Sequence, residues 1–396
     1  MTKIITSVLL SVLLASLAAG NTVLPLSDSA QISLLTSAPH DEVVYALYGH
    51  TSIRVKDDAA RLDKVFNYGI FDFSKPNFIY RFAKGETDYM LGAYNFKNFI
   101  AEYQERGSEV FEQRLNLLPE EKEALWQALA LNASPENRVY RYNFFFDNCA
   151  TRPIEMIEKN INGTVNYQGV ETKETFRHAI NYLTREQIWL TFGCDLVVGL
   201  PADRVMTQKE RLFLPDNLKD YLTHSVIVRG ETSQPMVLKT NTLVEQQPKP
   251  EQKPRLLSSP LICFSIVFVL LLILTLTEMI SKKYFRMIDC ILFFVAGISG
   301  CIIFFLSFFS VHPSMFPNIN LLWLHPLHLV GVIFFSIKKL KKPAFWYHFI
   351  NFAAIFAMCI AWFFIPQHFN IAFIPLIASL FLRSSRALLR KKLFIE

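Results

Sequence analysis

Long apolar segments alternate with short polar ones over the last third of the chain. Five such segments occupy residues 260–277, 288–310, 320–337, 344–365 and 369–382. A helix needs about 20 apolar residues to cross the hydrocarbon core of a bilayer, and the segments approach that length, the last being the shortest. The pattern therefore predicts five transmembrane helices within residues 260–383, followed by a basic tail at residues 384–396.

A shorter apolar run lies at the beginning of the chain. Lys3 is followed by apolar and small residues from Ile4 to Leu17, and then by Ala18-Ala19-Gly20. One early positive charge, a short apolar run and small residues at its end are typical of a secretory signal peptide. We therefore expect residues 1–20 to form a signal peptide, with an uncleaved N-terminal anchor as the alternative.

The region between these apolar segments has the mixed pattern of a globular protein. Residues 21–235 are predicted to form one exported α+β domain, since this length suffices for a sizeable core. Residues 236–259 are predicted to be a linker, because the stretch from Glu245 to Pro254 contains three prolines in ten residues and no large apolar side chain. The chain is thus expected to consist of an exported domain, a linker and a membrane module.

Positive charge is distributed unevenly along the chain. Residues 256–396 carry 12 basic and 3 acidic side chains, whereas the preceding residues carry 28 basic and 31 acidic ones. The 12 basic residues follow the first, third and fifth predicted spans, at 282–286, 338–342 and 383–392, and therefore all lie on one side of the membrane. Since positively charged flanks stay in the cytoplasm, the C-terminus is predicted to be cytoplasmic and the exported domain to lie outside.

Charge and composition also exclude several classes of protein. The exported part is slightly acidic, so nucleic acid is not an expected partner. The sequence contains no metal-ligand cluster, phosphate-binding loop or glycine-rich dinucleotide motif, and we therefore expect neither a metal nor another cofactor.

Cys149 and Cys194 are the only two of the six cysteines that lie in the predicted exported domain. From their number alone, a disulfide is expected in an oxidising compartment. The surroundings of Cys149 favour a different role, because residues 142–146 read as a buried strand, Asp147 or Asn148 is suited to cap a helix, and a helical pattern follows. A thiol at a helix N-terminus has a lowered pKa and is a better nucleophile.

A nucleophilic thiolate requires a base, and His50 is the best-placed histidine of this domain. It follows a glycine and opens an alternating strand, and the next strand, at residues 64–73, is suited to pair with it as a hairpin. Asn67 and Asp72 are the candidates on that strand to orient the imidazole. A one-residue slip in register would exchange the two faces, so both remain open, with a slight preference for Asn67.

The sequence resembles the circularly permuted papain-like thiol enzymes, in which the histidine precedes the cysteine, in its order Gly49-His50, Asn67-Tyr68-Gly69 and Asn148-Cys149. That group includes the lecithin–retinol acyltransferases. The chain is more closely similar to a bacterial envelope family that includes a lipoprotein N-acyltransferase. The similar segments, within about residues 25–235, are 48–54, 66–73, 82–89, 142–153, 199–203 and 213–215. The resemblance implies a permuted papain-like α+β domain followed by a five-helix transmembrane module in the bacterial inner membrane, with the catalytic domain on the periplasmic side.

The resemblance also implies a reaction. Cys149 would take an acyl chain from a membrane phospholipid as a thioester and pass it to the N-terminal amine of a diacylglyceryl-cysteine lipoprotein. His50 would act as acid and base, oriented by Asn67 or Asp72. The candidate substrate contacts are Asn148, Arg152, Tyr68 and Arg54. Aromatic residues around these motifs are expected either to line an acyl groove or to belong to the core: Phe71, Phe73, Phe78, Tyr80, Phe82, Phe144, Phe145 and Phe146.

Two other functions stay open at this point. A membrane-tethered papain-like peptidase or amidase acting on the cell wall would have a polar substrate cleft. A non-enzymatic envelope scaffold would pair Cys149 with Cys194 in a disulfide.

Overall fold

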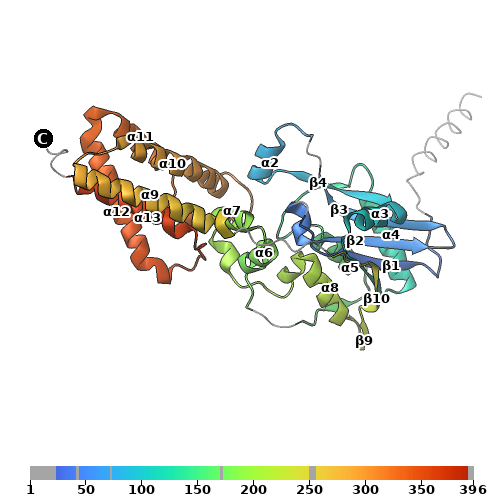
Figure 1. The fold of residues 1–396 in the computed structure, drawn as a ribbon. Coiled ribbons are helices and arrows are strands. Elements are labelled where there is room, and N and C mark those ends of the chain that lie inside the picture. Colours follow the sequence, from blue (N-terminus) through green and yellow to red (C-terminus); the bar gives the residue numbers. More distant parts are fainter. Residues whose placement is uncertain (1–23, 42–43, 72–73, 170–172, 249–255, 391–396) are drawn as a thin grey trace, which may run out of the picture.

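The computed structural model describes residues 24–41, 44–71, 74–169, 173–248 and 256–390. The predicted signal peptide at residues 1–20 lies outside this part of the chain. A sheet-containing domain and a bundle of long helices lie side by side, joined near α6 (Phe176–Thr184) and α7 (Ile188–Val197) (Figure 1).

A seven-stranded antiparallel sheet forms the centre of the first domain, in the order β10-β5-β1-β2-β3-β4-β6. Its strands are β1 (Gln31–Ser37), β2 (His50–Asp57), β3 (Leu62–Ile70), β4 (Asp88–Asn95), β5 (Val110–Leu115), β6 (Val139–Arg141) and β10 (Val237–Val244). A second, three-stranded sheet consists of β7 (Thr164–Asn166), β8 (Val226–Arg229) and β9 (Thr232–Pro235).

Helices cover both faces of the large sheet because its strands bury side chains on both sides. On β2, Ile53 and Val55 point into a core shared with α4 (Pro119–Asn132) and α5 (Thr151–Lys159). On β3, Val65 points the other way and packs with Phe99 of α3 (Phe96–Arg106). This two-residue alternation is the periodicity of a strand buried on both faces.

The remaining elements of this domain connect the sheet to the site and to the long helices. They are η1 (Val44–Tyr48), α2 (Phe78–Lys84), η2 (Leu200–Asp203), η3 (Glu210–Phe213) and α8 (Pro215–His224). Of these, α2 reaches out from the sheet towards the long helices (Figure 1).

The predicted linker at residues 236–259 begins too early. Strand β10 (Val237–Val244) lies within it and pairs with β5 as an edge strand of the large sheet. Half of the side chains of β10 are exposed and one is buried, which explains why its sequence reads as polar and unstructured. The exported domain therefore extends beyond residue 235, and the prediction of a linker from residue 236 is wrong for these residues.

The helical module consists of α9 (Pro260–Ser281), α10 (Arg286–Phe308), α11 (Leu327–Ser336), α12 (Lys341–Ala361) and α13 (Phe373–Leu388). Short turns η4 (Leu256–Ser258), η5 (Ile319–Leu322), η6 (Lys338–Leu340) and η7 (Trp362–Phe364) precede or join them. In the described part of the chain, four helical stretches are long and apolar enough to cross a membrane, at residues 260–281, 286–308, 319–336 and 338–364. Of the fifth predicted segment, at residues 369–382, residues 373–382 lie in α13, whose 16 residues also include Arg383 and Arg386.

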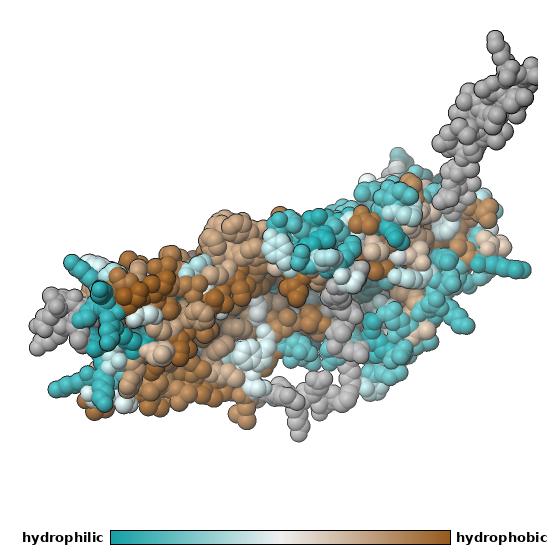
Figure 2. Space-filling model, turned by 90° about the horizontal axis from the view of Figure 1, so that it is seen from above, coloured by the Kyte–Doolittle hydropathy of each residue, from teal (hydrophilic) through white to brown (hydrophobic). Residues whose placement is uncertain are grey.

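Hydrophobic side chains gather over this helical half of the molecule, whereas hydrophilic ones cover the sheet domain and the far tip of the helices (Figure 2). The two parts meet through α7. Phe192 contacts Phe373 of α13, with ring centroids 5.3 Å apart, and the buried Asp195 accepts hydrogen bonds from Arg177 (3.3 Å) and Asn370 (2.9 Å). Charged and amide groups therefore fix the sheet domain on the helical bundle.

A buried ion cluster holds α13 against α9 and α10. The guanidinium of Arg383 is fully buried and lies 2.9 Å from the Glu278 carboxylate and 2.6 Å from that of Asp289. It also donates a hydrogen bond to the hydroxyl of Thr275 (3.0 Å). Charges in an apolar bundle are tolerated only when they are paired in this way. The arrangement explains how a helix that carries arginines packs among apolar ones.

Substitution of Arg383 tests this cluster. In Arg383→Ala, Glu278 and Asp289 lose their main cationic partner, and we expect the detergent-solubilised protein to be destabilised by about 3–5 kcal/mol. Thermal unfolding followed by circular dichroism measures the change. Lys342→Ala removes an exposed cation and should leave the unfolding temperature almost unchanged; equal unfolding temperatures for both variants would contradict the role of the cluster.

Candidate functional site

A tightly bonded turn presents Cys149 at the start of α5, directly before the N-cap residue Ala150. The buried side chain of Asn148 accepts hydrogen bonds from the backbone N–H groups of Ala150 (2.8 Å) and Thr151 (2.9 Å). Its amide donates to the carbonyl oxygens of Phe144 and Phe213, both at 2.8 Å. Because every polar atom of Asn148 has a partner in this turn, the orientation of the neighbouring Cys149 is closely defined.

The expected location of Cys149 at a helix N-terminus is confirmed, but the strand predicted before it is wrong. Residues 142–146 form a turn, in which Asn143 and Asp147 make an isolated bridge. The side chain of Asn143 accepts hydrogen bonds from the backbone N–H groups of Phe145 (3.1 Å) and Phe146 (3.2 Å). An asparagine that bonds its own backbone two and three residues ahead favours a turn over a strand, even in an apolar sequence.

His50 opens β2, as its position after a glycine predicted. Gly49 has a φ of +73°, and a Cβ atom there would lie 2.8 Å from the carbonyl oxygen of Ser37. Only glycine fits this approach without strain, and the turn aims the His50 imidazole at Cys149. The two side chains lie close enough for the charge of each to act on the other.

Asn67 holds the other side of the imidazole. Strand β3 pairs with β2 so that Asn67 lies opposite Ser52, and its side-chain oxygen is hydrogen-bonded to Nε2 of His50. Since Nε2 is taken, Nδ1 is the ring nitrogen available to the thiol. The alternative orienting residue, Asp72, lies outside the described residues, as does Phe73.

The site favours an ion pair between the thiolate and the imidazolium. Burial, the largest influence, opposes ionisation of Cys149, but the positive charge and hydrogen bond of His50 outweigh it and lower the pKa of the thiol. The backbone N–H groups of Thr51 and of Cys149 itself also stabilise the thiolate. For His50, burial lowers the pKa, whereas the Cys149 thiolate and the bond to Asn67 raise it, with a net increase.

Gly69 clears the space beside this pair. Its φ is +94°, and a Cβ atom there would lie 3.5 Å from Cβ of Cys149 and 3.9 Å from Cε1 of His50. Gly69 belongs to the motif Asn67-Tyr68-Gly69, but no function was predicted for it from the sequence. Its position two residues after Asn67 is the feature that could have indicated a role in the site. Thr51, which acts through its backbone N–H, was also missed and has no signal in the sequence.

The other candidate substrate contacts do not reach the site. Arg54 is buried and paired with Asp63 (2.8 Å) and Glu112 (2.9 Å), two strand positions beyond Ser52. Tyr68 follows Asn67 on β3 and therefore points to the opposite face of the sheet, where its hydroxyl donates to Asn132 (2.6 Å).

Two further candidates adjoin Cys149 but serve the turn that carries it. Arg152 is paired with Asp147 and lies over the ring of Tyr140, 3.8 Å from its centroid. The side chain of Asn148 is fully used in the turn. Asn148 has no free polar atom in its side chain, and Arg152 is held by Asp147 and Tyr140, so both contribute to the turn that carries the nucleophile.

Aromatic rings form the wall of the site. Tyr89 and Tyr142 stack with centroids 4.1 Å apart, and both lie within electrostatic range of Cys149. Burial, followed by the nearby Cys149 charge, raises the pKa of Tyr89 to about 12, so this phenol stays neutral. Tyr89 and Tyr142 thus give the nucleophile a large, uncharged wall on one side.

Cys194 is not a partner of Cys149, since both are free thiols in the structure. Cys194 is hydrogen-bonded to Tyr48, and burial, together with the Asp195 charge, raises its pKa to about 11. The disulfide considered from the cysteine count is therefore not formed.

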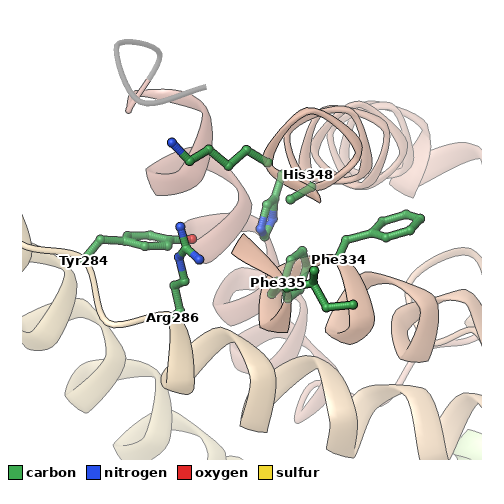
Figure 3. Close-up of a pocket in the computed structure, with 8 residues that line it drawn as sticks. Tyr284, Arg286, Phe334, Phe335 and His348 are labelled. Carbon is green, nitrogen blue, oxygen red and sulfur yellow. The ribbon is translucent and has the colours of Figure 1, made fainter. Parts of the chain in front are cut away.

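A separate pocket lies between the long helices at their basic end (Figure 3). Its lining residues include Arg286 and Lys341, and His348, whose ring stacks on Phe335 at 4.4 Å. It holds no cysteine and lies in the other half of the molecule from Cys149. Across the described residues, no group of three or more His, Cys, Asp and Glu side chains is arranged to hold a metal ion. The cluster around Cys149 is therefore the candidate active site.

Comparison with known families was made for the whole chain. Residues 26–184 match the family model described as the Lnb N-terminal periplasmic domain, and residues 251–393 match that described as the Lnb transmembrane domain. No curated protein and no solved structure matches the chain.

The ion pair leads to a prediction for the pH dependence of alkylation. Cys149 of the full-length protein should react with iodoacetamide with a midpoint below that of an ordinary thiol, because its folded-state pKa is lowered. In His50→Ala the stabilising cation is lost while burial remains, so the midpoint should rise by about one pH unit or more. Mass spectrometry of the Cys149 peptide measures the rate; Cys194, with its raised pKa, is the internal control. Identical midpoints in the two proteins would rule out the ion pair.

The role of Gly69 can be tested by comparing its substitution with that of another glycine that has a positive φ. Gly69→Ala introduces both a strained φ and a methyl group against the pair, and we expect alkylation of Cys149 to slow at pH 7. Gly230 also has a positive φ, +58°, but no atom lies within 4 Å of its would-be Cβ. Gly230→Ala therefore shares the backbone strain without crowding the site. If both variants react as the unchanged protein does, the space beside Cys149 does not matter.

Proposed function

Because the chain belongs to the Lnb family, whose members combine a periplasmic domain with a transmembrane domain in the inner membrane, we propose that it is a lipoprotein N-acyltransferase. In this proposal an acyl chain moves from a membrane phospholipid, through a thioester on Cys149, to the N-terminal amine of a diacylglyceryl-cysteine lipoprotein.

The observation that carries the proposal is the arrangement of Cys149, His50 and Asn67. A half-buried thiol with a lowered pKa lies beside an imidazole whose Nε2 is held by an amide oxygen. Such a constellation serves covalent catalysis, since the nucleophile and its proton carrier are preorganised. Its aromatic surroundings suit an acyl chain better than a polar peptide stem, which disfavours the cell-wall peptidase or amidase.

The first half-reaction forms the acyl-enzyme. The Cys149 thiolate attacks the ester carbon of the phospholipid, and the backbone N–H groups of Thr51 and Cys149, which act on the thiolate, are the proposed donors for the developing oxyanion. When the carbon–oxygen ester bond breaks, the His50 imidazolium gives its proton to the departing oxygen of the lysophospholipid. The products are a lysophospholipid and a thioester on Cys149, with His50 neutral.

The second half-reaction discharges the thioester. A terminal α-amine has an ordinary pKa near 8, so a useful fraction is unprotonated at neutral pH. This amine attacks the thioester carbon, neutral His50 takes one proton from the attacking nitrogen, and the carbon–sulfur bond breaks. An amide forms on the lipoprotein, and the thiolate–imidazolium pair is restored.

The finer topology belongs to the same proposal. We propose a signal peptide at residues 1–20, a permuted papain-like arrangement in which His50 precedes Cys149, and five spans of which α13 is the last. The pairing of Arg383 with Glu278 and Asp289 supports placing α13 among the spans. The basic residues at the far tip of the helices support a cytoplasmic C-terminus.

Acyl-enzyme formation tests the reaction. Full-length protein incubated with phospholipid alone should gain one acyl group on Cys149, detected by intact mass, because the first half-reaction needs no acceptor. Cys149→Ala should gain none. His50→Ala should be acylated about 100-fold or more slowly, since the nucleophile is less ionised and the leaving oxygen unprotonated. Cys194→Ala is the control and should behave as the unchanged protein.

Discharge of the acyl-enzyme then separates transfer from hydrolysis. A diacylglyceryl peptide with a free N-terminal amine should remove the acyl group, whereas the same peptide with an acetylated amine should not. If water removes it as fast as the amine does, the protein is a hydrolase. If Cys149 is never acylated, the proposed mechanism is wrong.

A further inference from the structure

Helix α2 exposes a run of large apolar side chains although it belongs to the periplasmic domain. No residue of this seven-residue helix is buried. Ile79 is 83% exposed, Tyr80 54% and Phe82 51%. Single exposed apolar residues are common on soluble surfaces, but three within four residues form a patch that needs a partner.

The charged side chains of α2 do not offset this patch. Arg81 is paired with Asp88 (2.8 Å) and Lys84 with Glu86 (2.7 Å), both on the chain that leads into β4. The helix therefore turns its charges to its own domain and presents apolar groups outwards.

Helix α2 is attached to one end of a predicted membrane span. The ring of Tyr80 contacts Phe305 of α10, with centroids 5.9 Å apart, and Phe82 contacts His312 at 6.3 Å. Two hydrogen bonds secure the contact: the His312 ring to the carbonyl oxygen of Phe82 and the Val311 N–H to that of Lys84, both 2.9 Å.

These contacts set the depth of α2 relative to the bilayer. Phe305 lies one turn before the end of α10 at Phe308, and the opposite end of α10 begins at the basic Arg286. Its 23 residues give a length of about 35 Å, close to the hydrocarbon thickness of a membrane. Helix α2 lies beside this end of α10 (Figure 1), which corresponds to the outer surface of a bilayer that α10 would cross.

A row of aromatic rings leads from α2 to the candidate site. Phe82 stacks on Phe78 (6.1 Å between centroids), Phe78 on Phe71 (6.2 Å), and Phe71 contacts Tyr89 (5.1 Å), which stacks on Tyr142 (4.1 Å). Phe71 is two residues from Gly69, which lies against Cys149. The row therefore connects the membrane surface with the nucleophile without a charged side chain among its members.

We infer that α2 dips into the outer leaflet of the inner membrane, and that the aromatic row guides the acyl chain of a bilayer phospholipid to Cys149. This inference rests on the proposed function. A phospholipid is the occupant that fits, because the patch is apolar, continuous with the α10 span and located where phospholipids begin. Its ester group reaches Cys149, while its acyl chain lies along the uncharged rings towards the bilayer.

Membrane contact of α2 can be measured without catalysis. Full-length protein with a photoreactive benzophenone amino acid at Ile79 is reconstituted in phosphatidylethanolamine–phosphatidylglycerol vesicles and irradiated. We expect a phospholipid adduct at this residue by mass spectrometry. The control places the same amino acid at Leu131, which is 66% exposed on α4. Equal lipid adducts at both positions, or a protein cross-link in place of lipid at residue 79, would overturn membrane insertion.

Guidance of the acyl chain is tested with two acyl donors. Ile79→Glu should slow acylation of Cys149 by vesicle phospholipid by about tenfold or more, because a carboxylate is expelled from lipid. Acylation by a water-soluble short-chain p-nitrophenyl ester should stay unchanged, since it needs no membrane. Leu131→Glu should alter neither rate.

The outcomes separate this inference from the proposed function. If Ile79→Glu reacts with vesicle phospholipid as fast as the unchanged protein, α2 does not guide the donor, although the acyltransferase proposal stands. If the unchanged protein itself is never acylated by phospholipid, the proposed function fails, whereas the benzophenone adduct still reports whether α2 enters the membrane.

Discussion

The buried contact between Cys149 and His50 is the interaction on which the rest of the periplasmic domain depends. Burial alone would raise the pKa of the thiol, and it is lowered only because the imidazolium and two backbone N–H groups act on the thiolate. The charge of each partner is in turn stabilised by the other. Neither residue would have its altered pKa in isolation, because a buried charge requires a partner within hydrogen-bonding distance. The fold must therefore bring two distant chain segments together closely.

Three local devices achieve this approach. The left-handed turn at Gly49 starts β2 at His50, opposite Ser37 of β1, and the pairing of β2 with β3 sets Asn67 behind the imidazole. On the other side, Asn148 uses its whole side chain to fix the turn before α5, so that Cys149 meets the end of the sheet. Gly69 leaves the space between them open. The side chains next to the nucleophile thus fix the positions of Cys149 and His50, and the surfaces left for a substrate are aromatic.

The helical module obeys the same physical rule under a different constraint. Arg383 is buried among apolar helices and is paired with Glu278 and Asp289, just as the Cys149 thiolate is paired with His50. Between the two clusters, Asp195 is buried at the junction and joins Arg177 of α6 with Asn370 before α13. Buried polar groups with defined partners fix orientation more strictly than apolar contacts do, since each requires a specific geometry. The site is consequently held at a set position relative to the spans, with α2 beside the outer end of α10.

Local patterns in the sequence were sufficient to predict the division into a globular domain and a membrane module, the helix start at Cys149 and the strand start at His50, because apolar periodicity and turn residues act over a few positions. The position of Asn67 behind His50 was decided by strand register, which a single sequence leaves open. The same holds for Arg54 and Arg152, whose acidic partners were not evident from local pattern. Strand β10 has a polar sequence, and its place in the sheet is evident only from its pairing with β5. Likewise, the burial of Arg383 in α13 is explained only by its acidic partners in α9 and α10. Contacts between residues far apart in the chain decide these features, since the free energy of a polar or charged group depends on what lies next to it in space.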